Sequence, residues 1–372
     1  MVEIVSDPEY MGISRERFEV AQKLLIEAVE KRRLMGAVMQ VACKGRALPV
    51  VTVGRKILND ESARVERDTI FLIASITKPI VCAAMMKWIE DGVVCLDDYA
   101  ADFLPAFGNR GKEHITLRHL LTHTSGLPDM LPDNQILRQT HQPLSVFVKK
   151  MCDLDLLFEP GSQISYQSCG IAILSAIVET LAGCSMPEIL KRYFFDPLGM
   201  KDTALGKPLD SKKRISEIVI PKSSDGGNGG TDWDWNSDYW HGFGAPWGGM
   251  FTTAQDLTTL CQMFLNGGAW KGKRILGRAT VAMMIDNHTD RLPDLLDADK
   301  KRHRWGLGWR LGDRKICGDL VSSQTFGHGG ATGTVAWMDP ESGVSFVLLT
   351  NQAEAANVLR PRISNVIASA II

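Results

Sequence analysis

The segment around Ser75 constrains the fold more than any other part of this 372-residue chain. The apolar run Phe71-Leu72-Ile73 before it predicts a short buried segment, and apolar residues after it recur at helical spacing from Ile80 to Ile89. Pro79 is tolerated in the first turn of a helix, where backbone NH groups lack partners, and is costly further in. Ser75 is therefore expected at or near the N-terminus of a long helix.

Lys78 follows Ser75 by three residues, in the only S-x-x-K of the chain. Residues three apart share one face of a helix, so the lysine amine can reach the serine hydroxyl. The partial positive charge of a helix N-terminus favours a developing alkoxide and opposes the extra proton on a buried lysine. The pair is a candidate nucleophile and base, although a chain of this length contains roughly one S-x-x-K by residue frequency alone.

The composition favours a globular enzyme with small partners. Hydrophobic residues make up 45% of the chain, enough for a substantial core. The 42 basic and 43 acidic residues leave a formal charge of -1, and no long block of like charge occurs. Nucleic acid and anionic membranes are therefore not expected as partners, and a small-molecule ester or amide is the expected one.

The eight cysteines are scattered through apolar patterns and form no C-x-x-C pair. They are interpreted as mostly buried thiols; this includes Cys169, which is interpreted as a helix-packing residue and not as a nucleophile. The first residues lack the basic and apolar regions of a leader, and no run reaches the ~18 apolar residues of a membrane span. These features favour a cytoplasmic setting, and the oligomeric state is left open.

The order of the predicted elements indicates an α+β fold. Ser14 can cap a first helix, and two short β-branched runs, 37–43 and 49–53, predict a hairpin. The pattern is then mostly helical to about residue 200, including a helix predicted over 144–157. Strand-like runs return at 305–311, 333–338 and 344–350, before a final helix running to Ile372. We predict one domain, 1–372, with an α/β part of about 11–74 and 250–372 and a helical part of about 75–249.

The segment 205–249 is rich in loop signals and aromatic residues. Gly226-Gly227-Asn228-Gly229-Gly230 is followed by four tryptophans and a tyrosine. Loops of this length are usually functional or disordered. Two interpretations stay open: the aromatic residues line the mouth of a cleft, with the segment 226–249 acting as a lid, or they only attach the loop to the body of the protein.

Three further stretches follow Ser75 in order along the chain. Leu120–Pro128 indicates a helix end that runs into a turn. Glu159–Ser168 indicates a loop that presents Tyr166 and a hydroxyl just before an apolar helix. The glycines of Phe326–Gly333 allow the backbone of a strand to approach a ligand closely, because they carry no side chain.

Together with the S-x-x-K motif, these stretches resemble the serine β-lactamase and penicillin-binding protein superfamily. The resemblance covers roughly residues 14–365 and is to the class C-like branch, which includes carboxylesterases of the family VIII type and D-aminopeptidases. The signature of the superfamily pairs S-x-x-K with a second polar motif and K-T-G, and the second motif is Y-x-N in this branch. Tyr166-Gln167-Ser168 stands for Y-x-N here, and His328-Gly329-Gly330 stands for K-T-G.

The resemblance implies a β-lactamase/transpeptidase-like fold, with an antiparallel sheet flanked by helices, and a mechanism without metal or cofactor. Ser75 would be the acylated nucleophile, activated by Lys78 and Tyr166, with the choice of base between them left open. The backbone NH groups of Ser75 and Ala331 would form the oxyanion hole, where one donor is typically worth about 2.7 to 4 kcal/mol. His123 is interpreted as a structural, hydrogen-bonding histidine.

The implied substrate-binding residues are Ser168, His328, Gly330 and Ala331, and two of them depart from the pattern of the family. Ser168 offers a shorter hydroxyl where asparagine can donate to an amide carbonyl, and His328, with an ordinary pKa of ~6.5, replaces a fixed cation. Both changes favour a carboxylesterase for short acyl esters over a β-lactamase or D-peptidase. If His328 binds carboxylates as a cation, anionic substrates should gain below pH ~6.5. A catalytically weak binding homologue is a further alternative.

Overall fold

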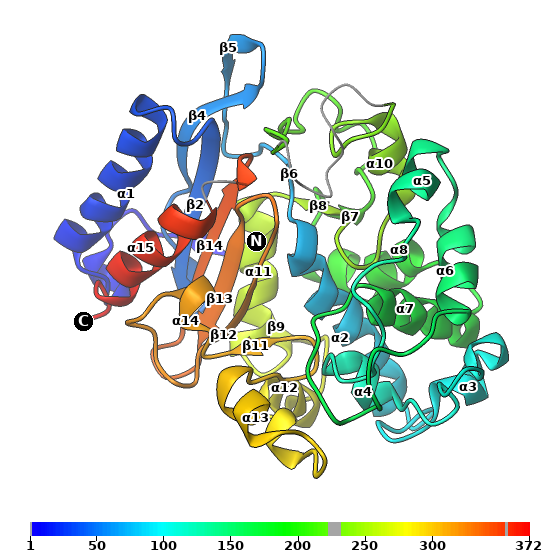
Figure 1. Ribbon diagram of the computed structural model, residues 1–372. Helices are drawn as coiled ribbons and strands as arrows, with labels where there is room; N and C mark the ends of the chain where they lie inside the picture. Colours follow the sequence, from blue (N-terminus) through cyan, green and yellow to red (C-terminus); the bar gives the residue numbers. More distant parts are fainter. Residues whose placement is uncertain (1, 222–231, 354–355) are drawn as a thin grey trace.

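The fold is built on a nine-stranded mixed sheet (Figure 1), in a computed structural model that describes residues 2–221, 232–353 and 356–372. Its main path runs β1-β3-β2-β14-β13-β12-β11, and β4 pairs with β2 and with β5. Among the named strands of the described residues, β1 and β3 are the one pair that runs parallel. The strands are β1 (Glu3–Ile4), β2 (Gly36–Cys43), β3 (Arg46–Ala47), β4 (Val51–Ile57), β5 (Asp60–Arg64), β11 (Arg310–Leu311), β12 (Phe326–Gly329), β13 (Val335–Asp339) and β14 (Val344–Thr350).

Alternation along the strands gives the sheet two apolar faces. Phe346 and Leu348 of β14 pack in one cluster with α1 (Arg15–Glu30) and α15 (Ala356–Ala368). Val347 and Leu349, which point the other way, join the larger core with α11 (Ala254–Leu265). Figure 1 shows α1 and α15 together on one side of the strands, with α11 on the other.

A second group of helices gathers around α7, on the side of the sheet opposite α1 (Figure 1). Helix α7 is buried over most of its length and packs against several neighbouring helices, because it is apolar nearly all round. A small sheet of order β6-β8-β7 joins the two parts. These elements are α2 (Thr77–Glu90), α4 (Leu117–Leu121), α6 (Leu144–Cys152), α7 (Cys169–Ala182), α8 (Met186–Leu190), β6 (Phe71–Leu72), β7 (Ala204–Leu205) and β8 (Met250–Thr252).

Several predicted boundaries are confirmed and three are wrong. Ser14 caps α1 by accepting a hydrogen bond from Arg17 N. The helix predicted to reach residue 157 ends with α6 at residue 152, and the final helix ends at residue 368. The predicted strand 305–311 contains only β11, because Gly308, with φ of 85°, turns the chain and Gly306 N donates to Trp309 O.

The tryptophans of the predicted loop are part of the core. Trp233, Trp235, Trp240 and Trp247 are each at most 6% exposed. Trp240 and Trp247 both pack against the ring of Phe243. This burial favours the interpretation that the tryptophans attach the loop to the body of the protein. It does not favour the interpretation that they line the mouth of a cleft. The glycine-rich stretch 226–230 lies outside the described residues, so the predicted lid stays a prediction.

Within residues 2–221, 232–353 and 356–372, no single helix combines the length and the hydrophobicity needed to cross a bilayer. The consecutive helical segments Cys169–Ala182 and Met186–Leu198 meet the criterion only as a pair, and they bend by 75° where they join.

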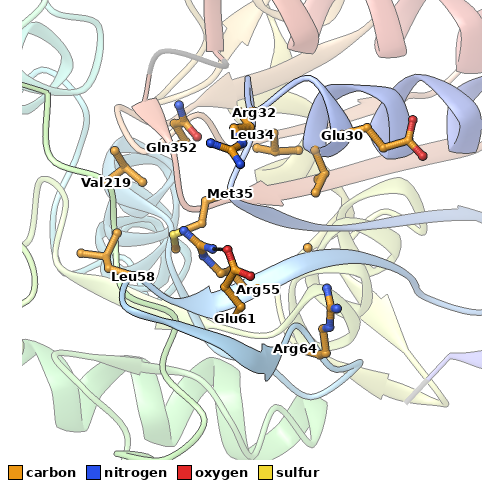
Figure 2. Close-up of a pocket in the computed structure, with 12 residues that line it drawn as sticks. Glu30, Arg32, Leu34, Met35, Arg55, Leu58, Glu61, Arg64, Val219 and Gln352 are labelled. Atoms are coloured by element: carbon orange, nitrogen blue, oxygen red, sulfur yellow. Dashed lines mark hydrogen bonds and ion pairs between the residues drawn. The ribbon is translucent and has the colours of Figure 1, made fainter.

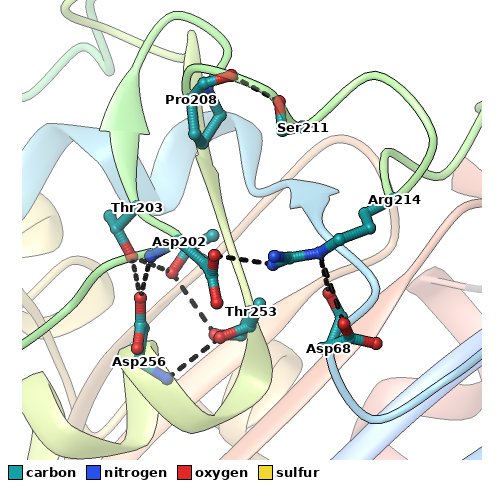
Figure 3. A network of polar contacts seen from close by, with 9 residues as sticks. Asp68, Asp202, Thr203, Pro208, Ser211, Arg214, Thr253 and Asp256 are labelled. Carbon is teal, nitrogen blue, oxygen red and sulfur yellow. Dashed lines mark hydrogen bonds and ion pairs between the residues drawn. The ribbon is translucent and has the colours of Figure 1, made fainter.

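A buried carboxyl group joins α11 to the segment before β7 (Figure 3). One Asp256 oxygen accepts hydrogen bonds from Asp202 N and from the Thr203 hydroxyl, both at 2.9 Å. Arg214 pairs with Asp202 at 2.7 Å, and among the ion pairs of the described residues none includes Asp256. Burial raises the pKa of Asp256 to about 6, and the hydrogen bonds only partly oppose that rise.

Asp256→Asn should therefore stabilise the protein more at pH 8 than at pH 5. The pKa of Asp256 is higher in the folded state than the ordinary 3.8, so wild-type stability from this group is lost as pH rises from about 4 through 6. The free energy of unfolding of the variant, relative to wild type, should rise by about 1 to 1.5 kcal/mol from pH 5 to pH 8. Urea unfolding at both pH values measures it, with Glu19→Gln on the exposed face of α1 as the control. An equal difference at both pH values would contradict the prediction.

Candidate active site

Ser75 lies in a tight turn at the start of α2, as the sequence predicts. The turn is a 3₁₀ helix, Ala74–Ile76, and Ala74 has a left-handed φ of 45°, a conformation that costs a residue with a Cβ free energy. Ile73 N donates to Met250 O, and the Thr77 hydroxyl accepts from Met250 N, so strand β8 holds the turn in place. Ser75 itself is half-buried and reachable from solvent.

Lys78 is buried next to Ser75. Its side chain is 1% exposed, and Nζ lies 3.3 Å from Ser75 Oγ and 2.9 Å from Trp247 O. Nζ also lies 4.6 Å from the centroid of the Tyr166 ring. Among the ion pairs of the described residues, none includes Lys78. The predicted lysine–serine contact is therefore present. Trp247, from the segment 205–249, contributes the carbonyl that orients the amine.

The loop that carries Tyr166 is folded by His123. His123 has a left-handed φ of 61°, which turns its carbonyl and its ring toward the loop. Ser165 N donates to His123 O at 2.9 Å, and Gln167 N donates to His123 Nδ1 at 3.2 Å. The two hydrogen bonds flank Tyr166, whose ring centroid is 4.9 Å from the His123 ring. His123 is thus a positioning residue for Tyr166, in agreement with its predicted structural role.

Ser168 lies at the N-cap of α7, two residues beyond Tyr166. It is 4% exposed, and its backbone N donates to Asp129 O. Within the described part of the chain its hydroxyl makes no hydrogen bond. The neighbouring Gln167 is engaged elsewhere, because Ser125 Oγ donates to its side-chain oxygen at 2.6 Å.

Two other side chains that could act as nucleophiles, those of Ser125 and Cys169, are buried near the loop that carries Tyr166. Ser125 is buried and bound to Gln167. Cys169 is buried at the start of α7, and burial strongly raises the pKa of its thiol, so the reactive thiolate is scarce near neutral pH. The prediction that Cys169 is a packing residue is in agreement with both observations.

The H-G-G segment on β12 packs against the turn that carries Ser75. A Cβ on Gly330 would lie 2.3 Å from Ile73 O and 2.2 Å from the Thr334 hydroxyl, so only glycine fits there. The Thr332 hydroxyl donates to Leu72 O at 2.8 Å, which fixes the loop to β6. Ala331, between these residues, is exposed, and its NH has no partner among the described residues. That NH is available for a substrate oxygen.

His328 is a neutral, buried histidine. It is 1% exposed, and Nδ1 donates to Gly329 O at 2.7 Å, which leaves Nε2 as an acceptor. Burial, followed by the nearby cations Arg310 and Lys78, holds its pKa well below the ordinary range. The expectation of a neutral His328 at pH 7 agrees with this environment. The conditional expectation that anionic substrates gain near pH 6.5 through a His328 cation does not, because the ring does not titrate there.

Trp305 and Arg310 complete the cluster of side chains around Tyr166 and were not predicted. The Trp305 ring stacks on Tyr166 with centroids 6.1 Å apart, and the Arg310 guanidinium lies 5.3 Å from the Tyr166 centroid and 4.5 Å from that of Trp305. Isolated pairing of Trp305 with Arg310 closes the loop between them. The signal in the sequence was the pair of glycines, Gly306 and Gly308, inside an otherwise strand-like run.

A separate cavity of about 430 Å³ lies away from this cluster (Figure 2). It is formed by the end of α1, the β4–β5 hairpin and two residues from other segments, Val219 and Gln352. Its charged groups are of both signs, and Arg55 pairs with Glu61 at 3.0 Å. None of the predicted site residues lines it, so it is not the candidate active site.

Comparison with known proteins places the chain in a family. The sequence model of the family described as Beta-lactamase matches residues 22–368. A Mycobacterium tuberculosis protein is 28% identical over 354 residues, which cover 85% of this chain and 83% of that one. A relative from Escherichia coli (strain K12), named provisionally as a D-alanyl-D-alanine carboxypeptidase, is 25% identical over 80% of this chain and 72% of its own length.

A solved structure described as a family VIII carboxylesterase has the same fold. It is 19% identical, covers 96% of this chain and 98% of its own, and superposes with a TM-score of 0.78. The predicted α+β, β-lactamase/transpeptidase-like fold is confirmed, with a mixed sheet where an antiparallel one was expected. The chain belongs to the Beta-lactamase family.

Proposed function

We propose that this protein is a serine hydrolase that forms an acyl-enzyme on Ser75 and acts as a carboxylesterase on short acyl esters. The observation that carries the proposal is the buried Lys78 amine, 3.3 Å from Ser75 Oγ, beneath the ring of Tyr166. A lysine buried beside a solvent-reachable serine has no evident structural function. It is suited to move a proton in nucleophilic catalysis.

In acylation, Ser75 Oγ attacks the ester carbonyl carbon while its proton passes to Lys78 or to Tyr166. The carbonyl oxygen becomes an oxyanion that the backbone NH groups of Ser75 and Ala331 stabilise. Collapse of the intermediate breaks the bond to the alcohol, which leaves with the proton. Water then attacks the acyl-enzyme by the same route and restores Ser75. The proton taken from Ser75 leaves with the alcohol, so the proposed steps balance without a cofactor or metal.

The ester preference rests on Ser168 and His328. A serine hydroxyl cannot donate as far as an asparagine amide, so an acylamino side chain gains less here. His328 is neutral, so the usual cation on this strand is absent at pH 7. A short ester carries neither an acylamino side chain nor a carboxylate, so it loses little binding free energy from either change. The names of the relatives do not decide between an esterase and a peptidase, since they include a carboxypeptidase and a carboxylesterase.

The main alternative is a β-lactamase or a D-amino-acid-specific peptidase or amidase. Arg310 favours it, because a guanidinium beside Tyr166 can meet the carboxylate that those substrates carry. A catalytically weak binding homologue is the second alternative. An activated phosphonate separates the latter from an enzyme, since covalent labelling needs a working nucleophile.

A hydrolysis panel at pH 7 tests the proposal. Aryl acetate and butyrate should give kcat/KM at least about tenfold above a chromogenic cephalosporin and a D-alanyl peptide, because each lost polar contact to substrate is worth about 1 kcal/mol or more. Higher kcat/KM for the cephalosporin or the peptide would overturn the esterase assignment and leave the serine mechanism in place. Absence of turnover on all of them would favour the binding homologue.

A further inference from the structure

The turn between β12 and β13 is bound by an arginine of α15. It comprises residues 330–334 and will be called the β12–β13 turn. Arg360 Nη1 donates to Gly330 O at 3.2 Å and to Thr334 O at 3.0 Å. Within the turn, Gly333 N donates to Gly330 O at 3.1 Å, and Gly330 N donates to Thr334 O at 2.9 Å. Each of these two carbonyls therefore accepts one hydrogen bond from the turn and one from Arg360.

The carbonyl of Gly330 and the NH of Ala331 belong to the same peptide group. A trans peptide is planar, so its C=O and N–H point in opposite directions. The donors on Gly330 O, from Arg360 and Gly333, therefore fix the direction of the Ala331 NH. That NH points away from Arg360 and has no partner among the described residues. It is the NH that the proposed mechanism assigns to the oxyanion.

Arg360 also brings a positive charge to this peptide group. Burial lowers the pKa of Arg360 to about 10, so the guanidinium stays charged at neutral pH. A hydrogen bond from a charged donor is about twice as strong as one between neutral groups, and it polarises the group that accepts it. The hydrogen bond on Gly330 O therefore makes the Ala331 NH a stronger donor as well as directing it.

Gly329, the middle residue of H-G-G, leaves room for the guanidinium. A Cβ on Gly329 would lie 2.5 Å from Arg360 Nη1 and 3.2 Å from Ile316 Cγ2. The motif K-T-G has threonine at this position, and a threonine side chain would occupy the space that Arg360 fills here. The glycine and the arginine thus form a matched pair.

We propose that Arg360 is a positioning residue of the oxyanion hole, which sets the direction and the donor strength of the Ala331 NH through the Gly330 carbonyl. The inference rests on the proposed hydrolysis through Ser75. Arg360 acts on the side of the peptide group remote from the substrate. Its loss weakens binding of the transition state, where the substrate oxygen carries the charge, more than binding of the uncharged ester.

Steady-state hydrolysis of an aryl butyrate tests the positioning role. Arg360→Met should lower kcat about 10- to 100-fold and leave KM within about threefold of wild type, because the weakened interaction belongs to the transition state. Arg360→Lys keeps a charged donor and should recover part of kcat. Arg362→Met, which removes an exposed arginine from the same helix, should change neither quantity. An unchanged kcat in Arg360→Met, or a loss confined to KM, would overturn the proposal.

Gly329→Ala disturbs the same contact and keeps every charge, so it serves even if Arg360→Met fails to fold. The added methyl group displaces the flexible end of Arg360, and kcat should fall about tenfold or more. In Arg360→Met protein there is no guanidinium to displace, so adding Gly329→Ala should lower kcat by less than about twofold. Losses that multiply in full would contradict the matched pair and overturn the proposal.

A trifluoromethyl ketone reports the oxyanion hole directly. Ser75 Oγ adds to the ketone carbon, its proton passes to Lys78 or Tyr166, and the former carbonyl oxygen carries the negative charge. With carbon-13 at that position, the NMR shift of the adduct gives the pKa of the oxygen. Tenfold weaker stabilisation raises this pKa by about 1, which is the rise expected for Arg360→Met and for Gly329→Ala. Partial unfolding lowers the amount of adduct and not its pKa. A pKa equal to that of wild type in both variants would overturn the proposal.

Crystal structures of wild type and of Gly329→Ala keep this inference distinct from the esterase proposal. The peptide group between Gly330 and Ala331 should rotate in the variant, because the Arg360 donor has moved away. Such a rotation, together with no turnover of any ester by wild type, would sink the esterase proposal alone. Ester turnover that all the variants retain, with the peptide group unmoved, would sink the positioning role alone.

Discussion

Ser75→Ala should lower kcat/KM on aryl esters by at least about 10⁴-fold while leaving the melting temperature within a few degrees of wild type. The change removes the one hydroxyl within hydrogen-bond distance of Lys78 Nζ among the described residues. It leaves the turn intact, because the hydrogen bonds that hold it run through Ile73, Thr77 and Met250. Steady-state hydrolysis and thermal unfolding of the same preparation measure both quantities.

Covalent labelling locates the nucleophile independently of substrate choice. An activated phosphonate should add one mass increment to wild type and none to Ser75→Ala. Ser175→Ala, which removes a buried hydroxyl from α7, is the matched control and should keep both activity and label. A label retained in Ser75→Ala and mapped to Ser125 or Cys169 would contradict the assignment.

The local parts of the site were predictable because their signals are short-range. S-x-x-K needs only helical spacing, and Pro79 and Ser14 mark helix starts through backbone chemistry that acts within one turn. Gly330 followed from the resemblance, and the structure adds the reason that only glycine fits between Ile73 and Thr334. The hydrogen bond from Lys78 to Trp247 is different, since it joins residues 169 positions apart.

The residues that sequence reasoning missed act through long-range contacts. Arg310 and Trp305 reach Tyr166 only because a glycine turn folds a strand-like run back on itself. His328 keeps an ordinary pKa in any argument from sequence alone, because burial and neighbouring cations are tertiary effects. The conditional expectation about its titration near pH 6.5 could not take these effects into account.

Lys78→Met and Tyr166→Phe should each lower the acylation rate by about 10²- to 10⁴-fold, and together by less than the product of the two losses. Methionine keeps the volume of the buried lysine, so the loss reports the amine and not a cavity. Lys78 Nζ lies 4.6 Å from the centroid of the Tyr166 ring and next to Ser75 Oγ, so the three side chains form one cluster in which we expect a shared proton path. In a variant that lacks one of these groups the proton transfer is already impaired, so removing the other group lowers the acylation rate by a smaller factor.

A burst measurement with an aryl ester gives the acylation rate of each variant. Tyr239→Phe is the matched tyrosine control, because its hydroxyl donates to Gln142 O outside the cleft. Combined with Lys78→Met, it should give the plain product of two independent effects. If Lys78→Met and Tyr166→Phe also multiply in full, the two groups act in separate steps. The shared proton path from Ser75 is then wrong, because removing two groups that move one proton in the same step lowers the rate by less than the product of the two single losses.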